Sequence, residues 1–115
     1  MDHVQAFEFD VTSMAFRLLS ERAVRFRDRG MSFKVHNLIR RNVANRNGYS
    51  SMLHIQFFDR TGRTVERIDH PVFQRGQAVA SLGQLEHALV TSLDHVPLHN
   101  EKPNKPDAFL AGLSA

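Results

Sequence analysis

The stretch MLHIQFFDRTGRTVERIDH, residues 52–70, carries the pattern that decides the fold. In its first half, successive side chains of an extended chain would point to opposite faces of a sheet. One face then carries the apolar residues Leu53, Ile55 and Phe57, and the opposite face carries His54, Gln56 and Phe58. The residues DRTGR that follow are typical of a tight hairpin turn, in which Gly62 takes a positive φ. The stretch therefore predicts two antiparallel strands joined at residues 59–63.

The second strand of this hairpin, TVERIDH, is less regular than the first. Val65 and Ile68 break strict alternation, which indicates a bulge or an edge position. Pro71 is expected to end the strand because proline has no amide hydrogen to give to a sheet. A further short extended piece is expected over residues 77–80.

A third strand is predicted upstream, in SFKVHNLIRR at residues 32–41. In this strand Phe33, Val35 and Ile39 are expected on the inner face. The outer face is expected to carry Lys34, His36, Leu38 and Arg40. His36 and His54 are then candidates for cross-strand neighbours, with Asp69 as a carboxylate that can approach them.

Two helices are predicted to flank these strands. Residues 3–11 alternate and predict a short edge strand, and a helix follows as far as Arg29, with Gly30 as its stop. Its expected apolar stripe is Ala15, Phe16, Leu19, Ala23 and Phe26. SLGQ at residues 81–84 has the spacing of a capping box, and it predicts a helix as far as Val96, ended by Pro97.

The predicted order is β-α-β-β-β-α, in a single small α+β domain with a mainly antiparallel sheet and two helices packed on one face. The domain is expected to occupy residues 1–97. Residues 98–115, which include PLHNEKPNKPD and AFLAGL, predict an extended C-terminal tail.

Composition excludes several classes of protein. The 115 residues contain no cysteine, so disulfides, thiolate zinc sites and cysteine nucleophiles are excluded. The chain has no apolar run of about 18 residues and no signal-peptide pattern in MDHVQAFEFD, which predicts a cytoplasmic protein with no membrane contact. Metal-ligand spacings, phosphate-binding loops and dinucleotide fingerprints are also missing, so no metal and no cofactor are expected.

Charge is concentrated in the middle of the chain. Residues 30–75 hold eight basic side chains against three acidic ones, and twelve of the fifteen basic residues of the chain are arginine. The predicted binding residues lie on the outer sheet face and in NLIRRNVANRNGYSS, residues 37–51: Lys34, His36, Arg40, Arg41, Arg46, Tyr49, His54, Phe58 and Arg67. Arginine suits phosphate and aromatic rings suit bases, so the leading prediction is a non-catalytic module that binds RNA or another acidic partner.

Two other functions fit the same sequence. A protein–protein module (an inhibitor, an adaptor or a homodimer) would use an exposed sheet edge or the AFLAGL segment. A small basic ribonuclease would use His36, His54 or His70 as general base, with an arginine beside the phosphate. Arg22, Arg25 and Arg29 are interpreted as an ordinary charged helix surface.

The layout of FEFDVTSMAFRLLSERAVRFRDR and SLGQLEHALVTSLDHV around the central strands resembles that of the ribosome-hibernation factors, over about 90 residues. That resemblance implies contact with ribosomal RNA. The last helix departs from the family, because SLDHVPLHNEK lacks its lysine-rich end, and no membership is inferred.

Overall fold

The computed structural model of the chain describes residues 3–40 and 48–97, and for residues 37–40 it describes the backbone alone. The elements follow in the order α1 (His3–Glu21), α2 (Ala23–Asp28), β1 (Ser32–Arg40), β2 (Ser50–Phe58), β3 (Thr64–Gln74), β4 (Gln77–Ala78) and α3 (Leu82–Asp94). The predicted α+β class is confirmed. The tail predicted for residues 98–115 lies outside the described residues, so the domain boundary at residue 97 stays a prediction.

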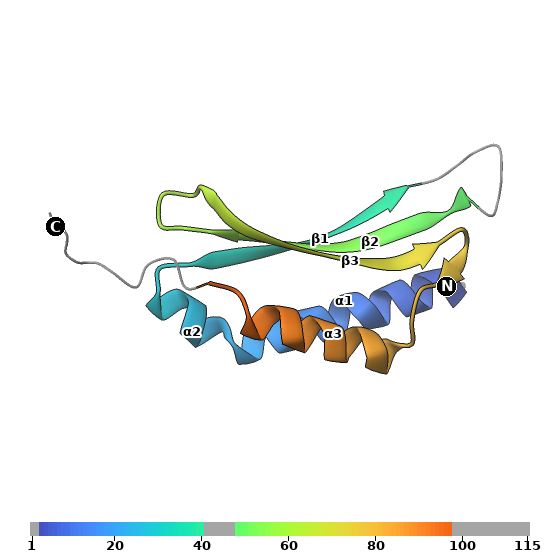
Figure 1. Ribbon diagram of the computed structural model, residues 1–115, viewed down its shortest axis with the longest axis horizontal. Coiled ribbons are helices and arrows are strands. Elements are labelled where there is room, and N and C mark those ends of the chain that lie inside the picture. Colours follow the sequence, from blue (N-terminus) through green and yellow to red (C-terminus); the bar gives the residue numbers. More distant parts are fainter. Residues whose placement is uncertain (1–2, 41–47, 98–115) are drawn as a thin grey trace, which may run out of the picture.

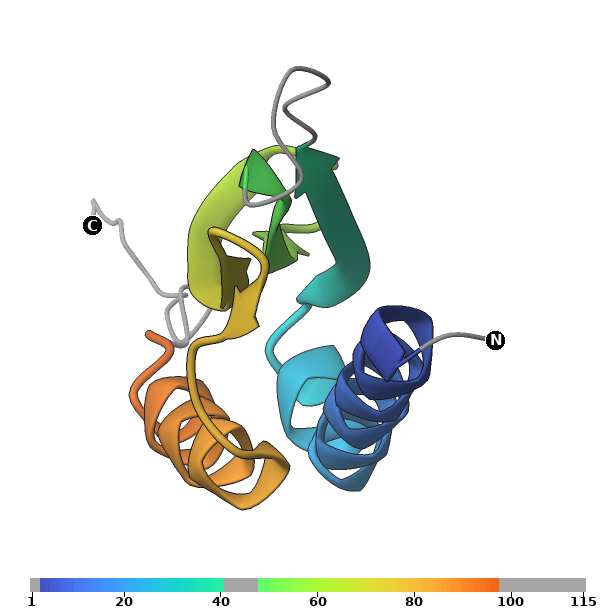
Figure 2. The same ribbon diagram turned by 90° about the vertical axis from the view of Figure 1, so that its right-hand side faces the viewer.

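The four strands form one antiparallel sheet in the order β1-β2-β3-β4. Figures 1 and 2 show the long helices α1 and α3 on the same side of this twisted sheet, with α2 beyond the end of α1. Within the described part of the chain, no helix lies over the opposite side, which we call the outward face.

The strand predicted for residues 3–11 is wrong, because these residues form the first half of α1. Phe7, Phe9 and Val11 alternate, but Val4, Phe7 and Val11 also follow the three- and four-residue steps of a helix. Burial decides between the two patterns: Val11 is buried, whereas Phe9 is 62% exposed. The predicted β-α-β-β-β-α order therefore fails at its first element, and the layout likeness to the hibernation factors loses its opening strand.

The single helix predicted as far as Arg29 is divided at Arg22, which has φ −110° and ψ 3°. Its Nη1 donates to the Leu18 carbonyl at 3.0 Å and so satisfies a carbonyl at the end of α1. The predicted stop at Gly30 is confirmed. The Gly30 amide donates to the Arg27 carbonyl and the Met31 amide to the Phe26 carbonyl, each at 2.9 Å. These two bonds make a Schellman motif, and Gly30 takes the left-handed φ of +73° that it needs.

The hairpin between β2 and β3 forms as predicted, with Gly62 at φ +86°. The Asp59 carboxylate accepts hydrogen bonds from the Thr61 hydroxyl (2.6 Å), the Thr61 amide (2.8 Å) and the Arg63 amide (3.1 Å). These bonds, that of the Thr61 hydroxyl first, hold the pKa of Asp59 below its ordinary value. The turn is therefore fixed by its own side chains.

The expected end of β3 at Pro71 is wrong, since the strand continues to Gln74. The register shifts twice against β2, once between Phe57 and Phe58 and once between Ser51 and Met52, which is opposite Pro71. A bulge was predicted near Val65 and is confirmed. β4 pairs only with Phe73 and Gln74, so Pro71 lies where no ladder bond to β4 is needed.

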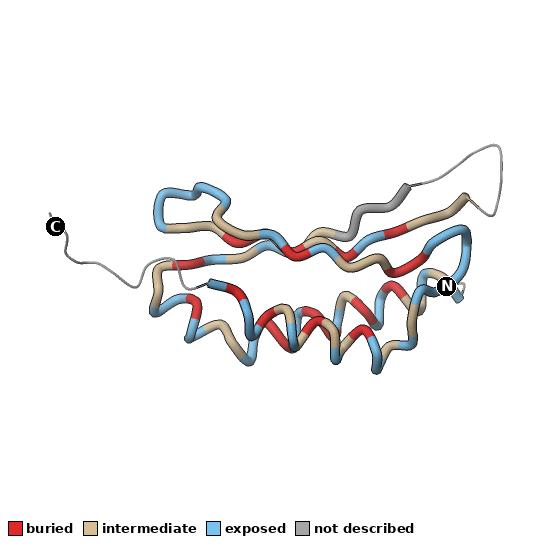
Figure 3. Tube along the Cα trace, in the orientation of Figure 1, coloured by how far each residue is buried: buried red, intermediate tan, exposed pale blue. Residues whose placement is uncertain are grey.

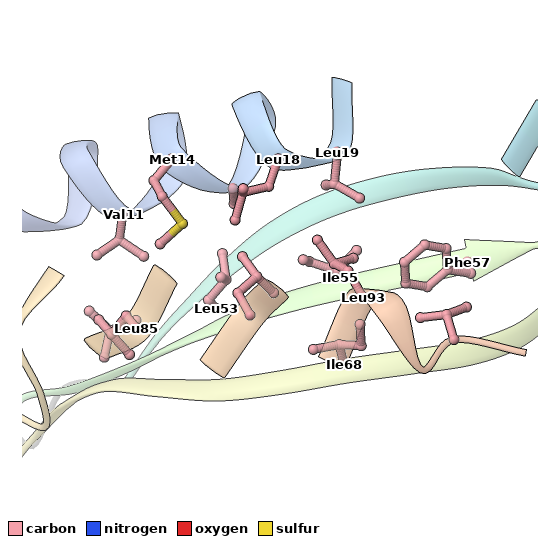
Figure 4. Close-up of a cluster of buried hydrophobic side chains, with 14 of the residues drawn as sticks. Val11, Met14, Leu18, Leu19, Leu53, Ile55, Phe57, Ile68, Leu85 and Leu93 are labelled. Carbon is pink, nitrogen blue, oxygen red and sulfur yellow. The ribbon is translucent and has the colours of Figure 1, made fainter. Parts of the chain in front are cut away.

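The core lies between the sheet and the two long helices, where the buried residues of Figure 3 face one another. Figure 4 shows Val11, Met14, Leu18 and Leu19 of α1 pointing at the inner side chains of the sheet. Those inner side chains include Leu53, Ile55 and Phe57, all buried as the alternation predicts. Phe16, which was expected in the stripe, is 50% exposed, because Met14 and Leu18 occupy the inner side of the helix instead.

The helix α3 begins with the predicted capping box. The Gln84 amide donates to Ser81 Oγ at 3.2 Å, and the Ser81 amide donates to Gln84 Oε1 at 2.9 Å. Ion pairs tie α3 to α1: Arg17 to Glu86 at 2.8 Å and Arg22 to Asp94 at 3.2 Å. Both pairs lie at the surface and join helix arginines to neighbouring acidic residues, as expected for an ordinary charged helix surface.

Candidate nucleic-acid interface

Three titratable side chains, which we call the histidine row, lie side by side across the outward face. Backbone pairing places His36 of β1 beside His54 of β2, and His54 beside Asp69 of β3. Residues paired across antiparallel strands point to the same side of a sheet, so all three side chains project outward. The two imidazole rings are 5.4 Å apart, centre to centre, with 43° between their planes. The predicted neighbours are therefore brought together.

Asp69 fixes the orientation of the His54 ring. Its Oδ1 is hydrogen-bonded to His54 Nδ1. Because a carboxylate only accepts hydrogen bonds, Nδ1 carries the hydrogen and Nε2 is left for other contacts. The His54 side chain is 14% exposed and that of Asp69 is 44% exposed, so the pair lies at the surface.

His36 has a ring nitrogen that is not satisfied. Its Nε2 is shielded from solvent and has no hydrogen-bond partner among the described residues. A shielded polar atom without a partner costs about 1–3 kcal/mol, which folded proteins usually avoid away from sites of function.

A second row of side chains, which we call the cationic row, lies beside the histidine row and carries positive charge. Lys34, Gln56 and Arg67 are paired across β1, β2 and β3. Gln56 Nε2 donates to Thr64 Oγ1 at 2.5 Å, which holds the amide in the middle of the row. Lys34 and Arg67 are exposed, and within residues 3–40 and 48–97 neither pairs with a carboxylate. The row therefore presents two cations on either side of a fixed amide.

Phe58 and Met52 add apolar surface to the outward face. Phe58 is half-buried and lies at the hairpin end of β2, next to the cationic row. Met52 is 37% exposed at the other side of the histidine row. Sequence reasoning had not selected Met52, although its place two residues before His54 puts it on the same face.

The remaining predicted binding residues are not gathered on this face. Arg40 pairs with Ser50 at the end of β1, with its side chain outside the described atoms, and Arg41 and Arg46 lie outside the described residues. Tyr49 is half-buried on the helix side: its hydroxyl donates to Glu8 Oε2 at 2.7 Å, and its ring meets Phe73 edge-on. No sequence pattern indicated this contact, because the strand wrongly predicted over residues 3–11 did not place Glu8 on an inner position.

His70 does not join the other two histidines. It lies on β3 next to Asp69 and therefore points to the helix side, where its Nε2 is 3.1 Å from Ser92 Oγ of α3. Burial lowers the pKa of His70, and Asp69 offsets only part of that effect. Of the three histidines considered as a general base, only His36 and His54 share a site.

The described residues contain no group of three His, Asp or Glu side chains placed to hold a metal ion. In the same part of the chain, no helix has both the length and the apolar character needed to cross a membrane. Comparisons with protein-family models, with curated proteins and with solved structures found no match. What the fold and site define is a small α+β protein with a sheet face over which no described helix lies and which carries cations, imidazoles and one aromatic ring.

Proposed function

We propose that this protein is a binding module that holds single-stranded RNA on the outward face of its sheet. The observation that carries the proposal is the row Lys34–Gln56–Arg67 beside Phe58, on a side over which no described helix lies. Two cations that have no carboxylate partner among the described residues are available for phosphates, and a half-buried ring is available for a base.

The geometry suits an unpaired strand better than a duplex. Lys34 and Arg67 are two strands apart, about 10 Å along the row, so their long side chains reach phosphates of nearby nucleotides. Bases that are not paired can lie against a sheet, and each base stacked on an aromatic ring contributes about 1–3 kcal/mol. In the described part of the chain, no helix protrudes from this face to enter a major groove.

Fluorescence anisotropy with a labelled single-stranded RNA tests the proposal. Binding should weaken with salt, with a log–log slope of about −0.7 for each phosphate contacted. Arg67→Ala and Lys34→Ala should each weaken binding and reduce the size of the slope by about 0.7, since each removes one contact. Arg27→Ala is the matched control, because Arg27 is an exposed arginine of α2 on the helix side. Binding that does not depend on salt, or an equal loss in Arg27→Ala, contradicts the proposal.

A second candidate function is self-association, and the edge of the sheet favours it. All nine residues of β1 pair with β2, and the other side of β1 has no strand beside it in the described part of the chain. Such an edge is a template for a strand from a second copy. Phe9 and Phe16, 62% and 50% exposed and seven residues apart on α1, add apolar surface on the helix side.

Light scattering separates the two functions. A dimer that is lost on Val35→Pro, a change that disrupts pairing along β1, supports self-association. If the protein is a monomer at all concentrations and still binds RNA, self-association is excluded and the RNA proposal stands.

A further inference from the structure

The histidine row next to the cationic row has a chemistry that binding does not need. A binding face uses cations, amides and rings, whereas His36–His54–Asp69 aligns a carboxylate-oriented imidazole with a second imidazole. We infer that this row is an acid–base centre that cleaves the RNA strand held on the outward face, with the 2′-hydroxyl of the RNA as the nucleophile. The inference rests on the proposed function, because the strand must first be bound.

His54 has the arrangement of a general base. Asp69 accepts the Nδ1 hydrogen, so Nε2 carries a lone pair and is free to take a proton from a 2′-hydroxyl. The carboxylate also stabilises the imidazolium that then forms. Asp69 acts through His54 and is a positioning residue rather than a catalytic one.

His36 is the second imidazole and supplies the acid. Ring centres 5.4 Å apart allow each imidazole to come within hydrogen-bond reach, about 2.6–3.2 Å, of a different oxygen on one phosphorus. Its Nε2, which no described residue bonds, is the atom left to hold a proton for the leaving group. Because this atom is shielded from solvent, the groups around it have to move when the RNA binds.

The step balances without another reactant. His54 removes the proton of the 2′-hydroxyl, the 2′-oxygen forms a bond to phosphorus, and the bond from phosphorus to the 5′-oxygen breaks. The 5′-oxygen takes a proton from His36. The products are a 2′,3′-cyclic phosphate and a 5′-hydroxyl, and one proton has moved from one imidazole to the other. Lys34 and Arg67, in the adjacent row, neutralise the charge that builds on the phosphate oxygens.

The test uses the full chain with an end-labelled single-stranded RNA and the DNA of the same sequence, in a buffer with a chelator. We expect cleavage of the RNA and a 2′,3′-cyclic phosphate end, because the nucleophile belongs to the substrate. The DNA should be bound but stay intact, since it has no 2′-hydroxyl.

Two substitutions examine the acid and the base. His54→Gln and His36→Gln should each slow cleavage by about a hundredfold or more, since general acid–base catalysis contributes about 10²–10⁴-fold. Both variants should still bind RNA. His87→Gln is the matched control, because His87 is exposed on α3, on the helix side of the sheet, and it should cleave as fast as the wild type.

The role of Asp69 is tested by measuring kcat and KM separately in two variants. Asp69→Asn should lower kcat with little change in KM, because the strand is still bound while the His54 ring is no longer held by a carboxylate. Asp69→Glu should restore part of kcat, since it returns a carboxylate to the row.

The outcomes distinguish this inference from the proposed function. RNA binding without cleavage overturns the acid–base centre and leaves the binding module standing. No binding at low salt overturns both. Cleavage that survives in His54→Gln, or products with a 3′-hydroxyl, also overturns the centre, because neither can come from the step described above.

Discussion

At the scale of single residues, Gly30 shows how one position combines a backbone and a packing requirement. Its φ of +73° is a conformation that side chains disfavour. A Cβ added there would also lie 2.2 Å from Arg60 Nε and 2.7 Å from Arg60 Cγ. The end of α2 and the β2–β3 hairpin therefore meet at a residue where glycine is strongly favoured.

We expect Gly30→Ala to lower the free energy of unfolding by about 1–2 kcal/mol, chiefly because alanine resists the left-handed conformation. Arg60 is exposed and can move aside, so the clash adds less. Gly83→Ala is the control: Gly83 lies in α3, and a Cβ there meets nothing within 4 Å. It should be neutral or raise stability by up to about 1 kcal/mol. Urea denaturation of both variants measures the difference, and equal effects would contradict the assignment.

The alternation of single residues was enough to predict two of the three residues of the histidine row. His54 lies between the inner apolar residues Leu53 and Ile55, and His36 directly follows the inner apolar residue Val35, so both are expected to point outward. Asp69 was only a candidate, because its alignment depends on the bulge near Val65, which sets the register of β3. The Tyr49–Glu8 hydrogen bond could not be predicted from the sequence, because it joins a residue before β2 to a helix segment that was predicted as a strand.

At the scale of elements, the first half of α1 shows where a sequence pattern is ambiguous. Phe9 made residues 3–11 look like a strand, yet it is exposed on the helix. The wider sequence favours the helix, since Val11, Met14, Leu18 and Leu19 continue the stripe begun by Val4 and Phe7. A window longer than a strand is needed to see this, because the helical period becomes distinct only over several turns.

The contact between β3 and α3 makes stability depend on pH. Burial lowers the pKa of His70 in the folded chain, and His70 Nε2 is 3.1 Å from Ser92 Oγ. The unfolded chain therefore takes up this proton at a higher pH than the folded chain does. The stability that neutral His70 provides is full above the ordinary pKa of about 6.5 and is lost as the pH falls below it.

Urea midpoints at about pH 7.5 and about pH 5.5 measure the effect. The wild type should lose stability on acidification, and His70→Gln should lose less, because glutamine has no proton to gain. His87→Gln, at an exposed position of α3, should keep the wild-type dependence. An unchanged dependence in His70→Gln would show that another group carries it.

At the scale of the whole molecule, the two sides of the sheet differ in the side chains that they carry. Figure 2 shows the helices α1 and α3 on one side of the sheet, where they bury its apolar side chains. The outward face carries the polar rows. Both the RNA proposal and the cleavage proposal require the outward face to stay open in solution. A tail or a second copy lying over it would remove the basis of both.

Two substitutions on one strand test this one-sided design. Ile55 is fully buried under the helices, so Ile55→Ala should cost about 2–5 kcal/mol. Met52 is on the outward face and 37% exposed, so Met52→Ala should cost under about 1 kcal/mol, because little apolar surface is removed from water there. Urea denaturation at two protein concentrations gives both values. A large cost for Met52→Ala would mean that the face is covered, and a Met52→Ala cost that grows with protein concentration would identify a second copy as the cover, since only association changes stability with protomer concentration.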